Sequence, residues 1–250
     1  MKVLITAGGT SEAIDSVRSI TNYSTGRLGS IIADCFAHNN ATVIYVCGGN
    51  AVLPASNKVE IIRIRNVQEL SRTFSKLLDK HRFDCVIHSM AVSDFTPQAM
   101  LTVDDIVTSV VSAVGSATND DLSAIIREAV LASGKPLNGQ KISSQHQDLM
   151  ILLKQAPKVI KLIKTKQPET ILAGFKLLSG ASEEELLQAA NILLAHNNCD
   201  FILANDLQNI KGDAHKAILL DKDGNIKRAA TKQEIAEILY KAVSERTKRF

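Results

Sequence analysis

A short polar segment near the amino end carries residue types that could bind a phosphate. It reads NYSTGRLG (22–29), follows the apolar run KVLIT (2–6) and leads into a helical pattern over 27–39. Backbone N–H groups at a helix start, with the hydroxyls of Ser24 and Thr25, can cradle an anion, and Gly26 and Gly29 allow close approach. The same residues could instead form only a helix cap and a turn. The spacing is neither GxxxxGK(S/T) nor GxGxxG, which argues against a P-loop NTPase and supports an ordinary Rossmann dehydrogenase only weakly.

Other candidate residues follow the apolar runs that we expect to be strands. Ligands of an open α/β sheet bind beyond the carboxyl ends of the strands. Five of the expected strands end in polar or glycine residues, in the segments 6–10, 48–50, 91–95, 174–176 and 204–206. These ends therefore predict one binding crevice.

Two further side chains could do chemistry. Lys141 follows a glycine-containing loop and lies on a predicted lid, where it could close over a charged intermediate. His88 lies near a strand's carboxyl end, although a half-buried structural histidine explains it better than a functional one. The six histidines form no HxxxH or HExxH pair and the four cysteines form no CxxC pair, so no transition-metal ligands are predicted. Ser24 and Ser93 lack a GxSxG context, which argues against a Ser-His-Asp hydrolase.

The elements that must position these residues alternate between strands and helices. This alternation predicts an α/β fold with a Rossmann-like, mostly parallel sheet and helices on both faces. An excursion over about 98–147 interrupts the rhythm and is expected to be a flap or an oligomer contact within a single domain, 1–250. Strands are expected over 2–6, 41–48, 59–65, 83–92, 148–155, 169–177 and 199–207, a hairpin over 215–230, and helices over 27–39, 66–81, 156–167, from Ser182, and over 231–249.

Composition indicates a globular cytoplasmic protein. Apolar residues make up 45% of the 250 residues and charged residues 22%, with a formal net charge of +3. The lysines and arginines are scattered, so no nucleic-acid partner is predicted. No apolar run approaches the roughly 20 residues that cross a bilayer, and the amino end lacks the design of a signal peptide. We therefore expect neither a membrane nor a secreted location.

The motifs resemble those of a known enzyme family. The opening TAGGTSEAIDSVRSITNYSTGRLG (6–29), then AVSDF (91–95), KISS (141–144), GFKL (174–177) and LAND (203–206) resemble phosphopantothenoylcysteine synthetase, also called phosphopantothenate–cysteine ligase. The resemblance covers nearly the whole chain in order. It is closest to the free-standing bacterial form, because 250 residues leave no room for the flavin decarboxylase domain that many bacteria fuse to it.

The resemblance implies a two-step ligation in coenzyme A biosynthesis. The carboxylate of 4′-phosphopantothenate would attack the α-phosphate of CTP, with Mg²⁺, and the amine of L-cysteine would then displace CMP from phosphopantothenoyl-CMP. Asn22 matches the residue that handles the acyl intermediate and the pantothenate, and Lys141 matches the catalytic flap lysine. Ala91 and Asp94 match a loop beside the base and the pantothenate. The implied nucleotide contacts are Gly8, Gly9, Ser24, Gly26, Gly29, His88, Ser89, Met90, Asp94, Phe175, Lys176 and Asn205. Metal ligands are not implied.

Some features depart from the bacterial pattern. Ile-Ser-Ser follows Lys141 where many bacterial members have KxKK, and the helical segment 186–198 after GFKL contains no lysine. Lys176 is the candidate replacement. These departures leave the choice between CTP and ATP open. An NAD(P)-dependent Rossmann oxidoreductase and a non-catalytic nucleotide-binding module are the alternative functions. The family resemblance also implies a homodimer with part of 98–147 at or near the interface.

Overall fold

The computed structural model describes residues 1–115, 121–137, 139–143, 145 and 147–248. These residues divide into two compact units, each described by itself. Unit 1 comprises Met1–Thr10, Asn22–Val92 and Pro157–Phe250, and unit 2 comprises Ser11–Thr21 and Ser93–Ala156. The described residues of the expected excursion, 98–147, all belong to unit 2, which extends beyond it at both ends.

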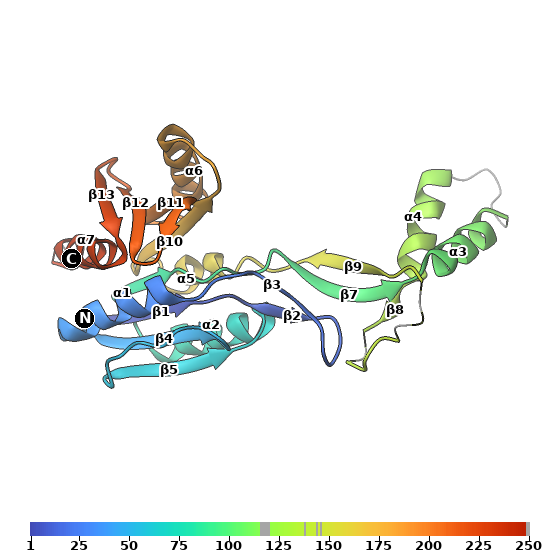
Figure 1. The fold of residues 1–250 in the computed structure, drawn as a ribbon, viewed down its shortest axis with the longest axis horizontal. Coiled ribbons are helices and arrows are strands. Elements are labelled where there is room, and N and C mark those ends of the chain that lie inside the picture. Colours follow the sequence, from blue (N-terminus) through green and yellow to red (C-terminus); the bar gives the residue numbers. More distant parts are fainter. Residues whose placement is uncertain (116–120, 138, 144, 146, 249–250) are drawn as a thin grey trace. The chain divides into compact units, whose positions relative to one another are not determined.

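Unit 1 is built on an eight-stranded sheet in the order β13-β12-β11-β10-β6-β1-β4-β5 (Figure 1). The strands from β11 to β5 in this order pair in parallel, and β12 and β13 add antiparallel at one edge. This topology confirms the predicted α/β fold with a mostly parallel sheet. The strands are β1 Lys2–Ala7, β4 Thr42–Gly48, β5 Val59–Ile64, β6 Cys85–His88, β10 Ile171–Leu178, β11 Phe201–Lys211, β12 Ala214–Asp221 and β13 Ile226–Thr231.

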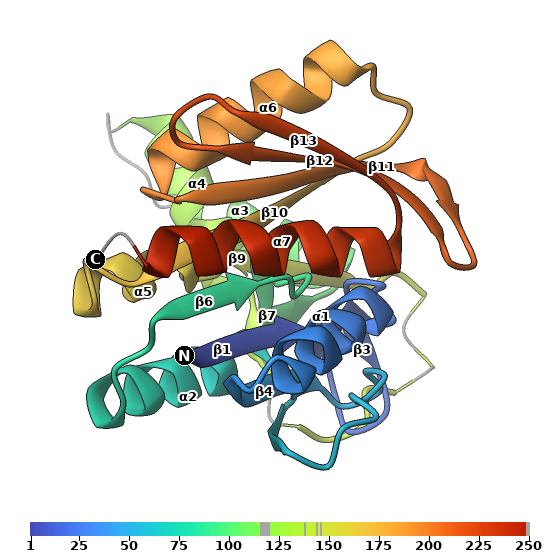
Figure 2. The same ribbon diagram turned by 90° about the vertical axis from the view of Figure 1, so that its left-hand side faces the viewer.

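Helices cover both faces of this sheet, as predicted. Helices α1 and α7 pack against each other on one face, where Phe36 and Leu239 join a buried cluster with Val3 and Ile5 of β1 (Figure 2). On the other face α2 contacts α5, and α6 packs on β10, β11 and β12. Because both faces are covered, β1 is buried from Val3 to Ala7 and reads as a continuous apolar run. The helices are α1 Arg27–His38, α2 Val67–Lys80, α5 Ile160–Lys166, α6 Glu183–His196 and α7 Lys232–Thr247.

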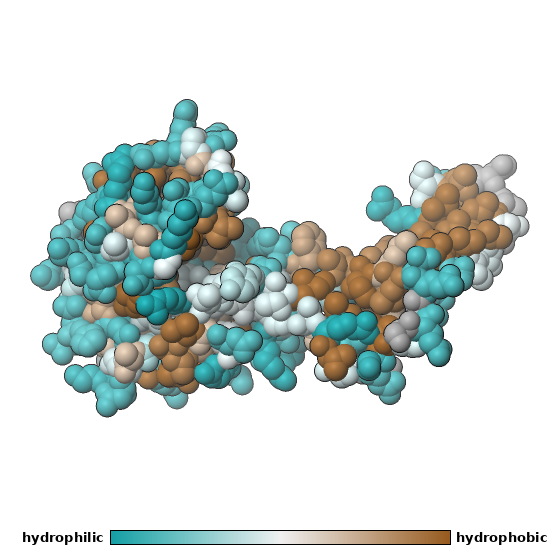
Figure 3. Space-filling model, viewed as in Figure 1, coloured by the Kyte–Doolittle hydropathy of each residue, from teal (hydrophilic) through white to brown (hydrophobic). Residues whose placement is uncertain are grey.

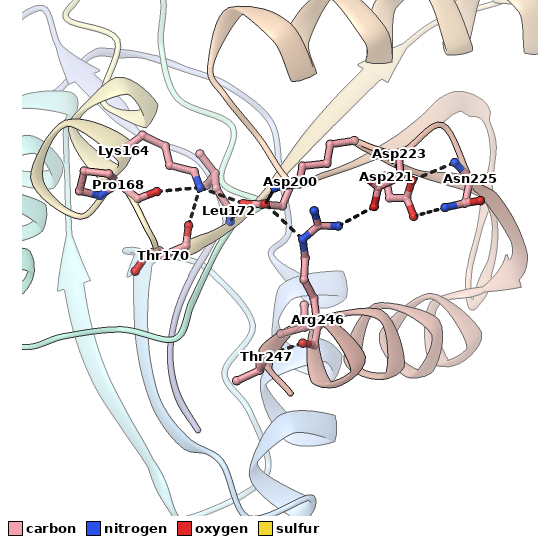
Figure 4. A network of polar contacts seen from close by, with 12 residues as sticks. Lys164, Pro168, Thr170, Leu172, Asp200, Asp221, Asp223, Asn225, Arg246 and Thr247 are labelled. Carbon is pink, nitrogen blue, oxygen red and sulfur yellow. Dashed lines mark hydrogen bonds and ion pairs between the residues drawn. The ribbon is translucent and has the colours of Figure 1, made fainter. Parts of the chain in front are cut away.

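A buried carboxylate joins several elements at the amino ends of the parallel strands (Figure 4). Asp200, which precedes β11 and is 4% exposed, accepts from Lys164 Nζ at 2.9 Å and from the Leu172 backbone N–H at 3.0 Å. Its other oxygen lies 3.1 Å from Lys222 Nζ and 3.4 Å from Arg246 Nε. Lys164 also donates to the carbonyls of Pro168 and Thr170. Asp200 therefore ties α5, β10, β12 and α7 together at the end of the sheet remote from the strand carboxyl ends.

Unit 2 contains two small antiparallel sheets and a helix pair. Strands β2 Ser11–Ala13 and β3 Ser19–Thr21 form a hairpin, and β7 Phe95–Leu101 lies between β8 Lys135–Pro136 and β9 Met150–Gln155. Helices α3 Val103–Gly115 and α4 Leu122–Ala132 pack on each other. In the segments that the structure describes, no helix combines the length and the apolar character needed to span a membrane.

The helices of unit 2 expose much apolar surface (Figure 3). Helix α3 has no buried residue, and α4 buries only Ala129. The exposed apolar side chains of the pair are Val103, Val107, Val111, Val114, Leu122, Ile126 and Leu131. We call these residues the α3–α4 apolar face.

Three sequence predictions need correction. The expected strand 83–92 ends at His88. Beyond it, Ser89 Oγ donates to the Thr6 carbonyl and the Ala91 N–H donates to the Gly8 carbonyl, at and just after the end of β1. The strand expected over 148–155 forms as β9, but it pairs with β7 in unit 2 and does not return to the main sheet. The helix expected over 156–167 is shorter and begins at Ile160. The hairpin around Asp223-Gly224 is confirmed by the pairing of β12 with β13.

Candidate functional site

The start of α1 is shaped to receive an anion. Its N-cap residue Gly26 has a φ of 73°, and in the described part of the chain no side chain caps the helix. Its first turn contains no acidic residue. The Arg27 N–H donates to Thr25 Oγ1 at 3.4 Å, but Gly26 offers no side-chain acceptor to the N–H groups that follow, and these present partial positive charge. A Cβ at position 26 would lie 2.9 Å from the Ala51 Cβ and 3.0 Å from the Gly8 backbone N, so only glycine fits there.

Close packing brings this helix start onto the ends of the central strands. A Cβ at Gly29 would lie 2.5 Å from the Cβ of Ala7, at the end of β1, and 3.0 Å from Ser89 Oγ, just after β6. Ser89 Oγ donates to the Thr6 carbonyl at 2.5 Å. The predicted loops thus meet where the parallel strands end.

Asn22 lies where the chain crosses between these loops. Its side-chain Nδ2 donates to the Val92 carbonyl at 3.1 Å. Beside it, the Ala91 N–H donates to the Gly8 carbonyl at 2.9 Å, and Gly9 pairs with Ala91 as an isolated parallel bridge. Asn22, Gly8, Gly9 and Ala91 are therefore brought together, as the strand-end rule predicted.

His88 lies beneath the site. It is 8% exposed, its ring makes an edge contact with Phe74 of α2, and its Nδ1 lies 2.9 Å from Thr6 Oγ1. Burial lowers the pKa of His88 to about 4, so the ring is neutral at pH 7. The same Thr6 hydroxyl accepts from the Met90 N–H at 3.2 Å. His88 thus supports the backbone of residues 88–90 from the α2 side.

A cavity of about 320 Å³ opens at the carboxyl ends of the strands in unit 1. The predicted site residues that line it are Ser24, Gly26, Gly29, Ser89, Met90, Ala91, Phe175 and Asn205. Gly8, Gly9, Asn22, His88 and Lys176 belong to the same unit but are not among the lining residues. Lys176 follows Phe175 on β10, and alternate side chains of a strand point to opposite faces of the sheet.

Three basic residues of the cavity wall are absent from the sequence prediction. They are Arg27, His215 of β12 and Lys232, the first residue of α7. Arg27 pairs with Asp213 at 3.1 Å, and Lys232 Nζ donates to the Gly212 carbonyl. Among the described lining residues there is no Asp or Glu. The cavity is therefore suited to an anionic ligand.

Two predicted residues, Lys141 and Asp94, belong to unit 2. The backbone next to Lys141 is anchored, because the Ile142 N–H donates to Asp15 Oδ2 at 3.1 Å and the Ile142 carbonyl accepts from Arg18 Nη2 at 2.9 Å. Arg18 also pairs with Asp15 at 2.6 Å, and this contact holds the pKa of Asp15 well below its usual range. The Asp94 carbonyl accepts from the Ala156 N–H at 2.8 Å. Ser144, the last residue of the KISS motif, lies outside the described residues.

The sequence contained partial signals for the residues that the prediction missed. Asp15 and Arg18 lie inside the long opening motif, with the three-residue spacing of a local ion pair. His215 is separated from Ala217 and Leu219, which join the buried cluster under α7, by the spacing of alternate strand residues, although the register of β12 shifts between Ala214 and Ala217. Among the described residues, no group of three or more His, Cys, Asp or Glu side chains could hold a metal ion.

Comparison with known proteins identifies the family. The DFP family, described as the DNA/pantothenate metabolism flavoprotein C-terminal domain, matches residues 1–106 and 107–247. The coenzyme A biosynthesis bifunctional protein CoaBC of Thermococcus kodakarensis is 28% identical over 246 residues, which cover 98% of this chain and 51% of that protein. The chain spans about half the length of the curated CoaBC relatives from Thermococcus kodakarensis, Bacillus subtilis and Methanocaldococcus jannaschii.

Solved structures give the same result. The crystal structure of the DNA/pantothenate metabolism flavoprotein from Streptococcus pneumoniae has a TM-score of 0.81 and 36% identity, and the match covers 98% of this chain and 99% of that one. A Cab2 mutant in complex with phosphopantothenate-cysteine shares the fold at 18% identity and a TM-score of 0.70, over 99% of this chain and 86% of that one. The chain belongs to the DNA/pantothenate metabolism flavoprotein C-terminal domain family, which confirms the family resemblance inferred from its motifs.

Proposed function

We propose that this chain is a phosphopantothenate–cysteine ligase that uses a nucleoside triphosphate. One observation carries the proposal: predicted nucleotide- and substrate-binding residues from four separate motifs line a single cavity that has basic residues and no described carboxylate. The uncapped start of α1 adds backbone donors to the same wall. An anionic nucleotide suits this site better than a cationic or neutral ligand does.

The names of the relatives support the substrate. CoaBC proteins are named for coenzyme A biosynthesis, and the Cab2 mutant binds phosphopantothenate-cysteine, the product that such a ligase would release. We extend this chemistry to our chain as part of the proposal.

The proposed reaction has two steps. A carboxylate oxygen of 4′-phosphopantothenate forms a bond to the α-phosphorus of CTP, and the bond from that phosphorus to the bridging oxygen of pyrophosphate breaks. The cysteine nitrogen then attacks the acyl carbon, CMP leaves with the bonding electron pair, and the nitrogen loses a proton.

Residues of this chain have separate roles in these steps. The start of α1 and the hydroxyl of Ser24 bind phosphate oxygens, and the carboxamide of Asn22, fixed by Val92, orients the acyl intermediate. Lys141 stabilises the charge that develops on the α-phosphate as pyrophosphate leaves. The Asp15–Arg18 pair anchors the backbone beside Lys141 and thereby limits where its ammonium group can reach.

Mg²⁺ is part of the proposal as a companion of the nucleotide. The cavity wall offers no described carboxylate, and the described residues contain no metal-binding cluster, so the protein groups on hand do not fit a resident Mg²⁺. Triphosphate oxygens are good Mg²⁺ ligands by themselves. We assign no step to a metal held by the protein.

The α3–α4 apolar face supports a homodimer. Large exposed apolar patches on soluble proteins mark interaction surfaces, and this face lies within the segment 98–147. We propose that a second copy of the chain covers part of it. The cytoplasmic location stays a prediction from the sequence.

Pyrophosphate release tests the proposed function. The protein is incubated with 4′-phosphopantothenate, L-cysteine, Mg²⁺ and CTP or ATP, and pyrophosphate and the nucleoside monophosphate are measured. We expect pyrophosphate only when phosphopantothenate is present, and CMP as the nucleotide product. Better turnover with ATP would replace CTP in the proposal and leave the ligation intact. Consumption of NAD(P)H without pyrophosphate would overturn the proposal.

A further inference from the structure

A buried histidine in the cavity wall has both ring nitrogens without a partner. His215 of β12 is 4% exposed, and neither Nδ1 nor Nε2 has a hydrogen-bond partner among the described residues. Buried polar atoms in folded proteins almost always have a partner, and those without one often mark a site for a ligand or a water. His215 lines the cavity, so a molecule bound there can reach its ring.

The turn after β11 contacts two cationic residues that line the same cavity. Lys232 is 6% exposed and lines the same cavity, and its Nζ donates to the Gly212 carbonyl while its backbone N–H donates to the Asp213 carbonyl at 3.1 Å. Arg27, at the start of α1, pairs with the Asp213 carboxylate at 3.1 Å. The turn thereby joins the first residues of α1 and α7, and both helix starts contribute to one cavity wall.

The ring and the ammonium group have complementary hydrogen-bonding capacity. Burial and, to a smaller extent, the nearby Lys232 charge lower the pKa of His215 to about 4, so the imidazole is neutral at pH 7 and offers one N–H donor and one acceptor. Burial also lowers the pKa of Lys232, whereas Asp213 raises it. An ammonium group has three N–H donors, and the Gly212 carbonyl uses one of them. A phosphate group can accept from both side chains.

We infer that His215 and Lys232 bind the phosphate groups of the nucleotide, as a second set of contacts beside the start of α1. The inference rests on the proposed function and names residues for it that none of the predicted motifs contains. Phosphate could come from the nucleoside triphosphate or from the phosphate monoester of phosphopantothenate. We assign the contacts to the triphosphate, because the start of α1, Arg27 and Lys232 are three positive features facing one cavity, and a triphosphate carries more negative charge than a monoester.

Calorimetric titration of the full chain with inorganic triphosphate, CTP, cytidine and 4′-phosphopantothenate tests this assignment. His215→Phe keeps a ring of similar size but removes the hydrogen bonds, and Lys232→Met removes the charge. The controls are His196→Phe at the exposed end of α6 and Lys241→Met on the exposed side of α7. We expect each site variant to bind inorganic triphosphate and CTP about tenfold more weakly, because a hydrogen bond to a charged group is lost, and both controls to bind as the unchanged protein does. Binding of phosphopantothenate should not change.

The outcomes separate this inference from the proposed function. Unchanged triphosphate affinity in both site variants would overturn the inference. Pyrophosphate release by the unchanged protein would still support the ligase function in that case. Weaker binding of phosphopantothenate alone would also overturn it. Triphosphate binding that needs His215, in a protein that makes no pyrophosphate, would support the inference and refute the function.

If His215→Phe does not fold, NMR of isotope-labelled histidine in the otherwise unchanged protein replaces it. Added triphosphate should then shift the ring signals of His215, assigned with His215→Asn. No shift at saturating triphosphate would overturn the inference.

Discussion

Replacing Asp200 by alanine should destabilise unit 1 without weakening the nucleotide site. The substitution removes the acceptor of the Leu172 N–H, and it leaves the Lys164 ammonium, whose side chain is 13% exposed, with two carbonyls and no counter-ion. Arg246, 11% exposed, keeps its ion pair with Asp223 at 3.2 Å and its contact with the Phe201 ring. The Lys222 side chain is 42% exposed and can be solvated by water, so loss of its ion pair with Asp200 contributes little to the destabilisation.

The size of the effect follows from these contacts. Breaking a buried ion pair by removing one partner costs about 3–5 kcal/mol, and the unpaired Leu172 N–H falls within the same loss. We therefore expect Asp200→Ala to lower the free energy of unfolding by about 4 kcal/mol, equivalent to a melting temperature lower by roughly 8–16 °C for a chain of this length. Asp200→Asn, which keeps an acceptor for Leu172, should lose about 2 kcal/mol.

Tyrosine fluorescence during urea unfolding measures this effect selectively. The chain has no tryptophan, and its three tyrosines, at 23, 45 and 240, all belong to unit 1. The matched control is Asp79→Ala, because Asp79 pairs with Lys166 at 2.7 Å but is 64% exposed, and such surface pairs contribute about 0–1 kcal/mol.

Two results would refute the reasoning. If Asp200→Ala and Asp79→Ala lost the same stability, the buried network would not stabilise unit 1 as argued. If folded Asp200→Ala bound CTP much more weakly than the unchanged protein, the two ends of the strands would not be independent. We expect the CTP affinity of Asp200→Ala to lie within twofold of that of the unchanged protein. Asp200 lies at the start of β11 and the cavity at its far end, and changes at well-separated sites have nearly independent effects.

Four further predictions follow from the proposed function and from the site. Asn22→Asp adds a carboxylate beside an anionic intermediate, so phosphopantothenoyl nucleotide should accumulate and be detected by mass spectrometry. Lys141→Gln should instead accumulate no intermediate and lower the reaction rate by about 10²–10³. Equal loss of the intermediate in both variants would refute these roles. Asp15→Asn should lower kcat with CTP affinity unchanged, because it releases the backbone beside Lys141, and a changed affinity with normal kcat would contradict this. Gly29→Ala should weaken triphosphate binding, since its Cβ would lie 2.5 Å from the Ala7 Cβ and displace the start of α1, and calorimetry would show it. Val111→Lys, at a side chain 66% exposed on the α3–α4 apolar face, should shift a dimer toward monomer in sedimentation at micromolar concentration, and a monomeric unchanged protein would contradict the dimer.

The main sheet and much of the cavity could be predicted from the sequence for a simple reason. The central parallel strands are buried on both faces and therefore read as apolar runs, and residues that line the cavity follow β6 or lie on β10 and β11. Phe175 and Asn205 could be assigned to one site from the sequence alone, because the carboxyl ends of parallel strands meet at one edge. The sequence indicated a phosphate-binding role for Ser24, Gly26 and Gly29 because they lie at the start of an expected helix.

The remaining elements depend on partners that are distant in sequence. Strand β7 contains Pro97, which normally disfavours a central strand, but the register with β9 shifts between Pro97 and Ala99, so a bulge accommodates it. The β2–β3 hairpin has strands of only three residues, too short to show an alternation. His215 stands alone among apolar and charged neighbours, and only the packing of α7 over β12 shows that it is buried without a partner among the described residues.

The order in which the cavity wall occurs along the chain has a consequence for protein synthesis. Its residues begin at Tyr23 and end at Lys232, so the wall is complete only when the chain up to Lys232 has left the ribosome. At roughly 5–20 residues per second, translation from Ala91 to Leu178 takes about 4–17 s, and during that time β6 lacks its neighbour β10. A nascent chain that stops before α7 would carry the start of α1 and its glycine loops but lack Lys232. Nucleotide can therefore make the full set of wall contacts only after synthesis has passed Lys232, and a ligand-dependent rise in protease resistance would report that the chain has reached this residue.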